Sequence, residues 1–324
     1  MKAMVCTRYG PPGVLELQEL DKPVPKADEI LVKVRASTVT AGDCEMRSFS
    51  FPLFLWIPLR LFFGVRKPRL NVLGQEFAGE IESVGSEQTR FQKGDRVFGS
   101  TELKLGANAD FLCLPSSYAI VRMPEGVRFE EAATIPTGGM NALFFLRKAR
   151  IQAGQKVLII GAGGSIGTMA IQLAKDSGAE VTAIDRGEKL DMLLSIGADH
   201  VIDYQQEDFT ANGEIYDVIF DVVGKNSFSK TIQSLKPKGV CLIANPSLGN
   251  ILRRFLPGMK SGRKIVVAAA GYQAEDLQYL SELLANGRIK PVIDRTFPLE
   301  GLREAHHYVE SGAKKGNVVI TNMR

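Results

Sequence analysis

Two patterns of apolar and polar residues divide the chain. In the first third, short apolar or alternating stretches are separated by turns rich in glycine and proline, which predicts strands. The predicted strands cover residues 14–17, 30–36, 77–85 and 95–99. Many short strands with such turns are typical of a barrel-like all-β domain.

Beyond about residue 124 the pattern changes to short apolar strands that alternate with helices. Residues 157–160 read Val-Leu-Ile-Ile, as expected of a strand that is buried on both faces of a parallel sheet. A helix of about 12 residues is predicted to follow from Ser165. Further strands are predicted at 181–184, 201–202, 218–220, 240–243 and 265–268. This alternation predicts an α/β fold with a doubly wound parallel sheet.

The last part of the chain, its length and its charge complete this outline. A helix is predicted near 300–311 and a strand at 317–321, and we expect both to fold back onto the first domain. The 324 residues suffice for two domains of about 150 residues each. The net charge of +4 is spread without a dense basic run, so nucleic acid is not an expected partner.

The four cysteines, Cys6, Cys44, Cys113 and Cys241, lie far apart and form neither a CxxC pair nor zinc-finger spacing. Scattered thiols suit a reducing compartment. The first residues, MKAMVCTRYG, lack the apolar region of a secretory signal. We therefore expect a cytoplasmic protein.

The most apolar stretch, residues 49–65, reads FSFPLFLWIPLRLFFGV. It is shorter than the ~20 residues that span a bilayer, and Pro52, Pro58 and Arg60 interrupt it. We expect a pocket-lining or partly exposed segment and no membrane span. About half or more of its aromatic residues are expected in the core, and the others indicate an apolar substrate mouth. These aromatic residues are Phe49, Phe51, Phe54, Trp56, Phe62 and Phe63.

Residues 156–176, KVLIIGAGGSIGTMAIQLAKD, join an apolar strand to an amphipathic helix through a glycine-rich turn, which is the context that a dinucleotide site requires. The first glycine permits the tight turn, the next two let the backbone approach a pyrophosphate, and the last lets helix and strand pack closely. The start of the helix favours phosphate through its N–H groups and dipole. The candidate cofactor contacts here are Gly161, Gly163, Gly164, Ser165, Ile166 and Gly167.

The next strand ends in Asp185, eighteen residues beyond Gly167, which is near the ~20 expected of a ribose-binding acid. A carboxylate there accepts hydrogen bonds from both ribose hydroxyls and repels a 2′-phosphate, which favours NAD(H). Arg186 and Lys189 can attract that phosphate instead, so NADP(H) stays open. The alternative is that Asp185 only caps a turn.

Several motifs, in order from one end of the chain to the other, resemble a single family. They are MKAMVCTRYGPPGVLEL, GQEFAGEIESVG, GDRVFG, EEAATIPTGGMNAL, GAGGSIG, GADHVIDY and KKGNVVI. Together they resemble the zinc-independent quinone oxidoreductase (zeta-crystallin-like) branch of the medium-chain dehydrogenase/reductase superfamily. The resemblance implies a GroES-like β-barrel catalytic domain at residues 1–123 and 289–324, and a Rossmann domain at 124–288.

Zinc-dependent relatives bind catalytic zinc at positions that here hold Thr40, Gln75 and Thr137. None is a good ligand, because zinc prefers thiolate, imidazole or carboxylate. Cys44 and Glu76 lie close in sequence, but a site improvised from them would lack the full ligand set. We therefore expect no zinc.

A chain without that Lewis acid is suited to acceptors that need little stabilisation of the negative charge formed on hydride transfer. Quinones and α,β-unsaturated carbonyls spread the incoming charge over a conjugated system, so the resemblance implies their reduction by NAD(P)H. Two other functions stay open: a nicotinamide-binding protein with little catalysis, in a structural, sensing or nucleic-acid-binding role, and an alcohol dehydrogenase. The cofactor motif and the apolar mouth favour the reductase.

The resemblance also indicates site residues. The Thr40 hydroxyl could donate a hydrogen bond to the substrate oxygen, and a buried threonine bonded to backbone is the equal alternative. Asp43 is either catalytic or orients other groups. The further implied cofactor contacts are Thr137, Tyr204, Val222, Val223, Asn245 and Asn317.

Two expectations concern the end of the chain. His306 and His307 lie in the predicted C-terminal helix, and we expect them on a solvated helix face. The last Rossmann strand, residues 264–269, pairs with its twin in this family, and a bare apolar edge strand needs such cover. We therefore expect a homodimer.

Overall fold

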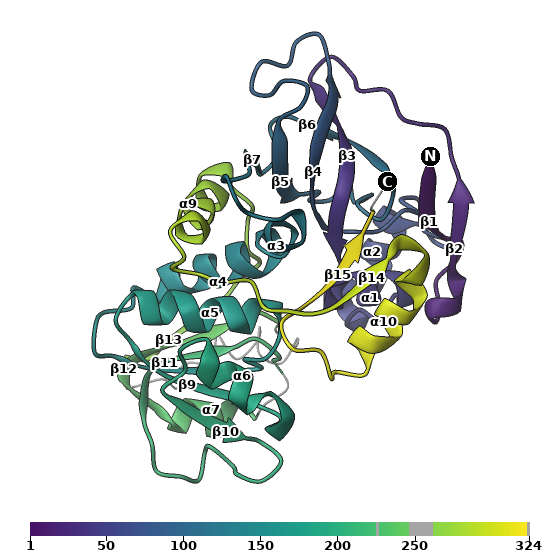
Figure 1. Cartoon of the computed structure of the whole chain (residues 1–324). Helices are drawn as coiled ribbons and strands as arrows, with labels where there is room; N and C mark the ends of the chain where they lie inside the picture. Colours follow the sequence, from purple (N-terminus) through teal and green to yellow (C-terminus); the bar gives the residue numbers. More distant parts are fainter. Residues whose placement is uncertain (225–226, 246–261, 323–324) are drawn as a thin grey trace. The chain divides into compact units, whose positions relative to one another are not determined.

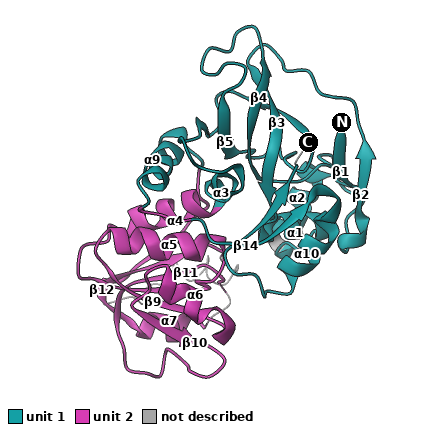
Figure 2. Ribbon diagram, in the orientation of Figure 1, with its two compact units in different colours: residues 1–137, 272–287, 291–324 teal, residues 138–271, 288–290 magenta. Residues whose placement is uncertain are grey.

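A computed structural model describes residues 1–224, 227–245 and 262–322, apart from the side chain of Phe54. The chain forms two compact units (Figure 2). Unit 1 consists of Met1–Thr137, Tyr272–Gly287 and Pro291–Arg324, and unit 2 of Gly138–Gly271 and Arg288–Lys290. The predicted fold class, an α/β chain with a GroES-like and a Rossmann part, is confirmed.

Unit 1 is built on a seven-stranded sheet in the order β14-β15-β3-β4-β5-β7, with β6 paired to β3. The C-terminal strand β15 runs antiparallel to β3, with Val319 opposite Thr38, which confirms that the end of the chain folds back onto the first domain. The strands are β3 (Glu29–Thr38), β4 (Glu76–Val84), β5 (Arg96–Ser100), β6 (Phe111–Pro115), β7 (Ile120–Arg122), β14 (Ile293–Pro298) and β15 (Asn317–Thr321). A separate hairpin pairs β1 (Lys2–Cys6) with β2 (Leu15–Glu19).

The helices of unit 1 are α1 (Ala41–Ser48), α2 (Leu53–Phe63), α3 (Phe129–Ala133), α9 (Ala274–Ala285) and α10 (Leu302–Glu310), with short 3-10 turns η1 (Pro12–Val14) and η3 (Leu299–Gly301). Figure 1 shows two groups of helices beside this sheet in unit 1, with α3 and α9 near β7, and α1, α2 and α10 near β14 and β15. α10 packs on α1, and its buried side chains join the apolar cluster beneath β1 and β15. No helix in the described part of the chain is long and apolar enough to cross a bilayer.

Unit 2 is a six-stranded parallel sheet in the order β10-β9-β8-β11-β12-β13. The strand order reverses between β8 and β11, and ligands bind at the carboxyl edge of such a reversal. The strands are β8 (Lys156–Ile160), β9 (Glu180–Asp185), β10 (His200–Asp203), β11 (Tyr216–Asp221), β12 (Leu235–Ile243) and β13 (Lys264–Val267). The helices are α4 (Pro136–Ala149), whose first two residues belong to unit 1, α5 (Ser165–Asp176), α6 (Leu190–Ser195) and α7 (Phe228–Gln233), with a 3-10 turn η2 (Gly187–Lys189).

The compact units and the boundaries predicted from the sequence differ in two places. Residues 124–137 and α9 belong to unit 1, where α9 packs against β7, whereas the sequence pattern grouped both with the Rossmann part. The sequence pattern gives the order of strands and helices along the chain. It does not show against which sheet a helix such as α9 packs. The domain boundaries stay a prediction.

Candidate cofactor and active site

The glycine-rich turn leaves the carboxyl end of β8 and enters α5. Gly161 has a φ of +77°, in the left-handed region that favours glycine, and a Cβ on it would lie 2.4 Å from Cγ2 of Val223. A Cβ on Gly167 would lie 2.5 Å from the backbone of Ala162. The tight turn and the close packing predicted for these two glycines are confirmed.

The start of α5 is open on the side where a phosphate would approach. A Cβ on Gly164 would meet no heavy atom within 4 Å. Gly164 is also the N-cap, and it supplies no side chain to cap the helix. A helix start without a side-chain cap presents backbone N–H groups and the positive end of the helix dipole. The geometry at Gly164, Ser165, Ile166 and Gly167 therefore fits a pyrophosphate.

Asp185 holds the turn in place. Its carboxylate accepts hydrogen bonds from the backbone N–H of Gly163 at 2.7 Å and from that of Arg186 at 2.9 Å, and it pairs with Nζ of Lys189 at 3.1 Å. Both side chains of this ion pair are buried. The structure therefore gives Asp185 the turn-holding role that the sequence left as the alternative, while ribose binding stays a prediction.

Arg186 and Tyr204 form a pair at the carboxyl ends of β9 and β10. Nε of Arg186 donates a hydrogen bond to the Tyr204 hydroxyl at 3.0 Å. Tyr204 is 52% exposed, and the Arg186 side chain is 36% exposed. Glu188 lies 3.9 Å from this guanidinium, too far to bond it closely. The pair presents an aromatic face and a cation to solvent.

The ends of β11 and β12 meet beside the glycine-rich turn. Asp221 ends β11, and its Oδ1 accepts hydrogen bonds from the N–H groups of Val223 at 3.1 Å and Gly224 at 2.8 Å. A Cβ on Gly224 would lie 1.8 Å from the Asn245 carbonyl oxygen. The structure thus brings Val222, Val223 and Asn245 together near Gly161. Sequence reasoning missed Asp221, although an acid that ends an apolar strand was a signal.

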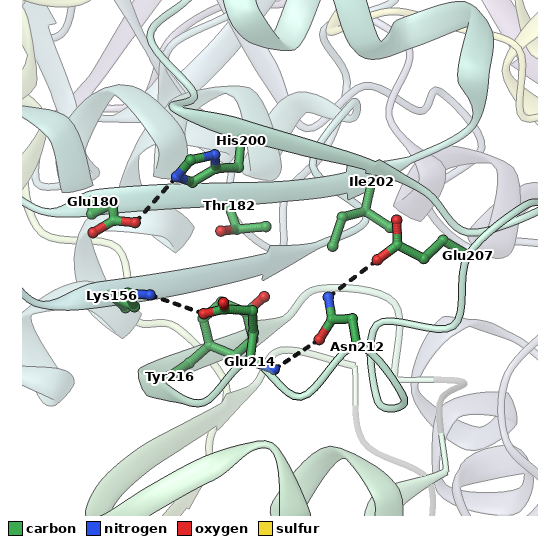
Figure 3. Close-up of a pocket in the computed structure, with 9 residues that line it drawn as sticks. All are labelled: Lys156, Glu180, Thr182, His200, Ile202, Glu207, Asn212, Glu214 and Tyr216. Carbon is green, nitrogen blue, oxygen red and sulfur yellow. Dashed lines mark hydrogen bonds and ion pairs between the residues drawn. The ribbon is translucent and has the colours of Figure 1, made fainter.

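A pocket of about 210 Å³ lies at the opposite, amino edge of the same sheet (Figure 3). Its lining comes from the starts of four strands and a nearby loop: Lys156, Glu180, Thr182, His200, Ile202, Glu207, Asn212, Glu214 and Tyr216. Lys156 pairs with Glu214 at 2.9 Å, and His200 pairs with Glu180 at 3.1 Å. The pocket shares no residue with the glycine-rich turn, so it is separate from the candidate cofactor site.

In unit 1, Thr40 and Asp43 form a capping box at the start of α1. The Thr40 hydroxyl donates to Oδ2 of Asp43 at 2.7 Å and accepts from the Asp43 N–H at 3.1 Å. Oδ1 of Asp43 accepts from the Gly74 N–H at 3.2 Å. Asp43 is fully buried, and burial raises the pKa of its carboxyl group. Both side chains are therefore engaged in holding α1 and the loop before β4.

Gln75 and Glu76 lie next to this box. Nε2 of Gln75, which is half-buried, donates to the Thr40 hydroxyl at 3.3 Å. The fully buried carboxylate of Glu76 accepts from the Thr137 N–H at 2.7 Å and from the Thr38 hydroxyl. Burial raises the pKa of Glu76 to about 7.

This cluster does not fit zinc. Thr40 and Gln75 present a hydroxyl and an amide that are already bonded to each other, and Thr137 reaches Glu76 through its backbone. In the described ranges, no three His, Cys, Asp or Glu side chains are grouped so that they could hold a metal.

The expectation of a solvated helix face is wrong for His306. His306 is fully buried, with Nδ1 at 3.3 Å from Sγ of Cys44 and at 3.3 Å from Nε of Arg47. Burial, together with the charge of Arg47, lowers its pKa to about 3. The packing of α10 on α1 turns His306 inward, whereas His307 is exposed as expected.

Asn317 also lies inside unit 1. Its side chain is 1% exposed, and Nδ2 donates to the Val292 carbonyl oxygen at 3.1 Å. Its role at the cofactor stays a prediction, as does that of Thr137.

Two family models match the chain. Residues 26–140 match the alcohol dehydrogenase GroES-like domain, and residues 196–320 match a family described as zinc-binding dehydrogenase. A 2-methylene-furan-3-one reductase of Solanum lycopersicum is 30% identical over 99% of this chain and 79% of its own length.

Solved structures agree over nearly the whole chain. The quinone oxidoreductase of Coxiella burnetii has a TM-score of 0.88 at 29% identity and covers 99% of both chains. The Escherichia coli quinone oxidoreductase, solved with NADPH, has a TM-score of 0.84 at 25% identity over 99% of this chain and 100% of its own. The chain therefore belongs to the medium-chain dehydrogenase/reductase superfamily, in its quinone oxidoreductase branch, and is an oxidoreductase that uses a nicotinamide cofactor.

Proposed function

We propose that this protein transfers a hydride from NADPH to an apolar quinone or α,β-unsaturated carbonyl. The observation that carries the proposal is the carboxyl edge of the unit 2 sheet. There an uncapped helix start follows a glycine turn, close to the exposed Arg186–Tyr204 pair. The names of the compared proteins, a furanone reductase and two quinone oxidoreductases, support the acceptor class.

The choice of NADPH rests on how the charges near Asp185 are arranged. The expected preference for NAD(H) required an Asp185 carboxylate able to accept ribose hydroxyls. That carboxylate is instead neutralised by Lys189 and bonded to two backbone N–H groups. Arg186 is the exposed cation there, and guanidinium groups match phosphate geometry. The NADPH in the Escherichia coli relative supports the same choice.

The chain's residues bind and orient the reactants. When bound, the nicotinamide supplies the hydride. The turn at Gly161 and the start of α5 hold the pyrophosphate, while Arg186 and Tyr204 hold the adenosine end. The Thr40 proton is already donated to Asp43, so the half-buried Gln75 amide is better placed than Thr40 to donate to the substrate oxygen.

Conjugation in the substrate then takes the role that zinc has in zinc-dependent relatives. A quinone or enone spreads the incoming charge, so one neutral N–H donor at Gln75 suffices, whereas a simple ketone needs stronger stabilisation of its oxyanion. We therefore expect NADPH oxidation with an ortho-quinone or an enone, and little with the matching saturated ketone. Equal rates with the ketone, or oxidation of a primary alcohol, would favour the alcohol dehydrogenase. Tight NADPH binding without turnover of any acceptor would favour a binding protein with little catalysis.

The substitution Arg186→Ala tests the cofactor assignment. It removes a charge-assisted hydrogen bond, which is worth about 1.5–3 kcal/mol, so we expect the KM for NADPH to rise about 10- to 100-fold. The KM for NADH should change little, and Lys230→Ala, which removes an exposed cation of the same unit that pairs with Asp208, is the matched control. An equal loss for both cofactors would contradict a 2′-phosphate contact.

We also infer a homodimer that forms through β13 (Lys264–Val267). This strand pairs only with β12 among the described strands, so its other edge carries backbone groups without a sheet partner there. Its side chains Val266 and Val267 are half-buried. Sedimentation equilibrium should give twice the mass of 35.4 kDa, and a monomer at micromolar concentration would refute the inference.

A cytoplasmic location, suggested by the scattered thiols, is also part of the proposed function.

A further inference from the structure

Helix α2 turns apolar side chains toward solvent. Leu53 is 88% exposed, Ile57 74% and Leu61 62%. These residues are spaced four apart and therefore lie on one face of the helix. A surface helix ordinarily places its polar face there and its apolar face on the core. A contiguous apolar face of this kind marks an interaction site.

The other side of α2 is fixed to unit 1. The Arg60 guanidinium stacks on the rings of Tyr9, Phe49 and Trp56, with centroid distances of 4.4, 4.0 and 4.7 Å. Its Nη1 donates to the Val65 carbonyl oxygen at 2.6 Å. The contacts of Arg60 with Tyr9 and Phe49 fix the inner face of α2 to unit 1, whereas Trp56 belongs to α2 itself. The exposed stripe is therefore the outer face of the helix.

The segment that contains α2 carries charges of one sign along the sequence, although one of its cations, Arg47, is buried and pairs with Glu310. Between Glu45 and Glu76 the chain contains no Asp or Glu, although it contains five Lys or Arg residues. Three of these, Arg66, Lys67 and Arg69, follow α2 directly and are exposed. An apolar helix beside a cationic cluster complements an anionic lipid surface, where the side chains enter the acyl boundary and the cations contact phosphates.

The dimensions of α2 suit a helix that lies on a bilayer. Its 11 residues extend for about 16 Å, well short of the hydrocarbon thickness of about 30 Å. Trp56, in the middle of α2, is 42% exposed. Tryptophan side chains prefer the headgroup region of a bilayer.

We propose that α2 and the cations of residues 66–69 dock this protein on the surface of an anionic lipid bilayer. A second copy of the chain fits the patch less well. In a symmetric contact the same cations would face each other, which is repulsive. The proposal does not depend on the reductase activity, because the docking is measured without cofactor or acceptor.

Trp56 makes the test direct, because it is the only tryptophan of the chain. The full-length protein is mixed with phosphatidylcholine vesicles that contain or lack phosphatidylserine, and flotation and Trp56 emission are recorded. We expect flotation and a blue shift with the phosphatidylserine vesicles, both weakened by salt, which screens the attraction. Absence of flotation at low salt, or flotation without a change in Trp56 emission, would overturn the proposal.

Paired variants locate the contact. Ile57→Gln with Leu61→Gln should abolish flotation and the blue shift without changing the net charge. Val24→Gln with Leu103→Gln is the matched control, because these residues are 84% and 62% exposed outside α2. Arg66→Gln with Lys67→Gln should weaken binding about fivefold per charge.

Two results would contradict the assignment. One is equal flotation of the Ile57/Leu61 variant and its control. The other is a blue shift that grows with protein concentration in the absence of vesicles, which would assign α2 to a contact between subunits.

Discussion

The glycine-rich turn of unit 2 and the Thr40 cluster of unit 1 hold their geometry by different means. At the turn, backbone conformation and close approach select the glycines, since Gly161 has a positive φ and Gly167 leaves no room for a Cβ. The buried Asp185 carboxylate adds a hydrogen bond from Gly163. In the cluster, Thr40, Asp43 and Glu76 are fixed by hydrogen bonds between buried side chains and the backbone. Backbone requirements select glycine at fixed spacing, whereas a side-chain network can be built from many residue types.

The largest effect that can separate the two regions is pH dependence of stability at Glu76. Its pKa rises from 4.5 to about 7 on folding. The native state therefore holds its proton more tightly, and stability falls as the pH rises from about 5 to 7, by on the order of 3 kcal/mol. Urea unfolding of Glu76→Gln across this range should show a shallower decline. An unchanged pH profile would contradict the buried Glu76 environment.

Substitution of the turn glycines tests whether close packing holds the turn. Gly167→Ala inserts a methyl group 2.5 Å from backbone, so we expect a loss of about 1–3 kcal/mol in the free energy of unfolding. Gly164→Ala, three residues away and facing open space, should cost less, about 0.5–1 kcal/mol, because alanine is a poorer N-cap than glycine. It should nevertheless weaken NADPH binding, because the methyl group occupies the pyrophosphate approach. Equal stability of the two variants would show that the turn is not held by close packing.

The smallest of the three expected effects on stability is at Thr40, and it tests whether Thr40 caps α1 or donates to the substrate. Thr40→Val removes the cap of α1 and should cost about 1 kcal/mol of stability, while Thr40→Ser keeps the hydroxyl and should be nearly neutral. If Gln75 is the donor to substrate, Thr40→Val retains kcat within a few-fold, and Gln75→Leu lowers it about tenfold or more. A greater loss of kcat in Thr40→Val than in Gln75→Leu would restore Thr40 as the substrate donor.

The parts of the fold that the sequence predicted are those with a local signal. Helix α5 begins at Ser165 as predicted, and β15 covers the predicted residues 317–321. The strands within residues 157–243 follow the apolar pattern closely. In contrast, the pattern did not indicate that α9 returns to unit 1, since that depends on tertiary packing.

In the candidate sites, too, features with a local sequence signal were predicted and features set by tertiary packing were not. The glycine-rich turn was recognisable from its spacing together with the apolar strand before it and the amphipathic helix after it. The engagement of Asp185 with Gly163 and Lys189 was not, because an acid at the end of a strand looks the same whether it binds ribose or its own turn. His306 shows the same limit: its burial depends on α10 packing on α1, which lies more than 250 residues away in sequence.

NADPH oxidation by chelator-treated protein of measured zinc content, with an ortho-quinone as acceptor, tests directly whether the Thr40 cluster works without a metal. We predict full activity in protein free of zinc, and no gain when zinc is added. Activity that disappears on chelation and returns with zinc would contradict the assignment of Thr40 and Gln75 as residues that position substrate in a site without metal.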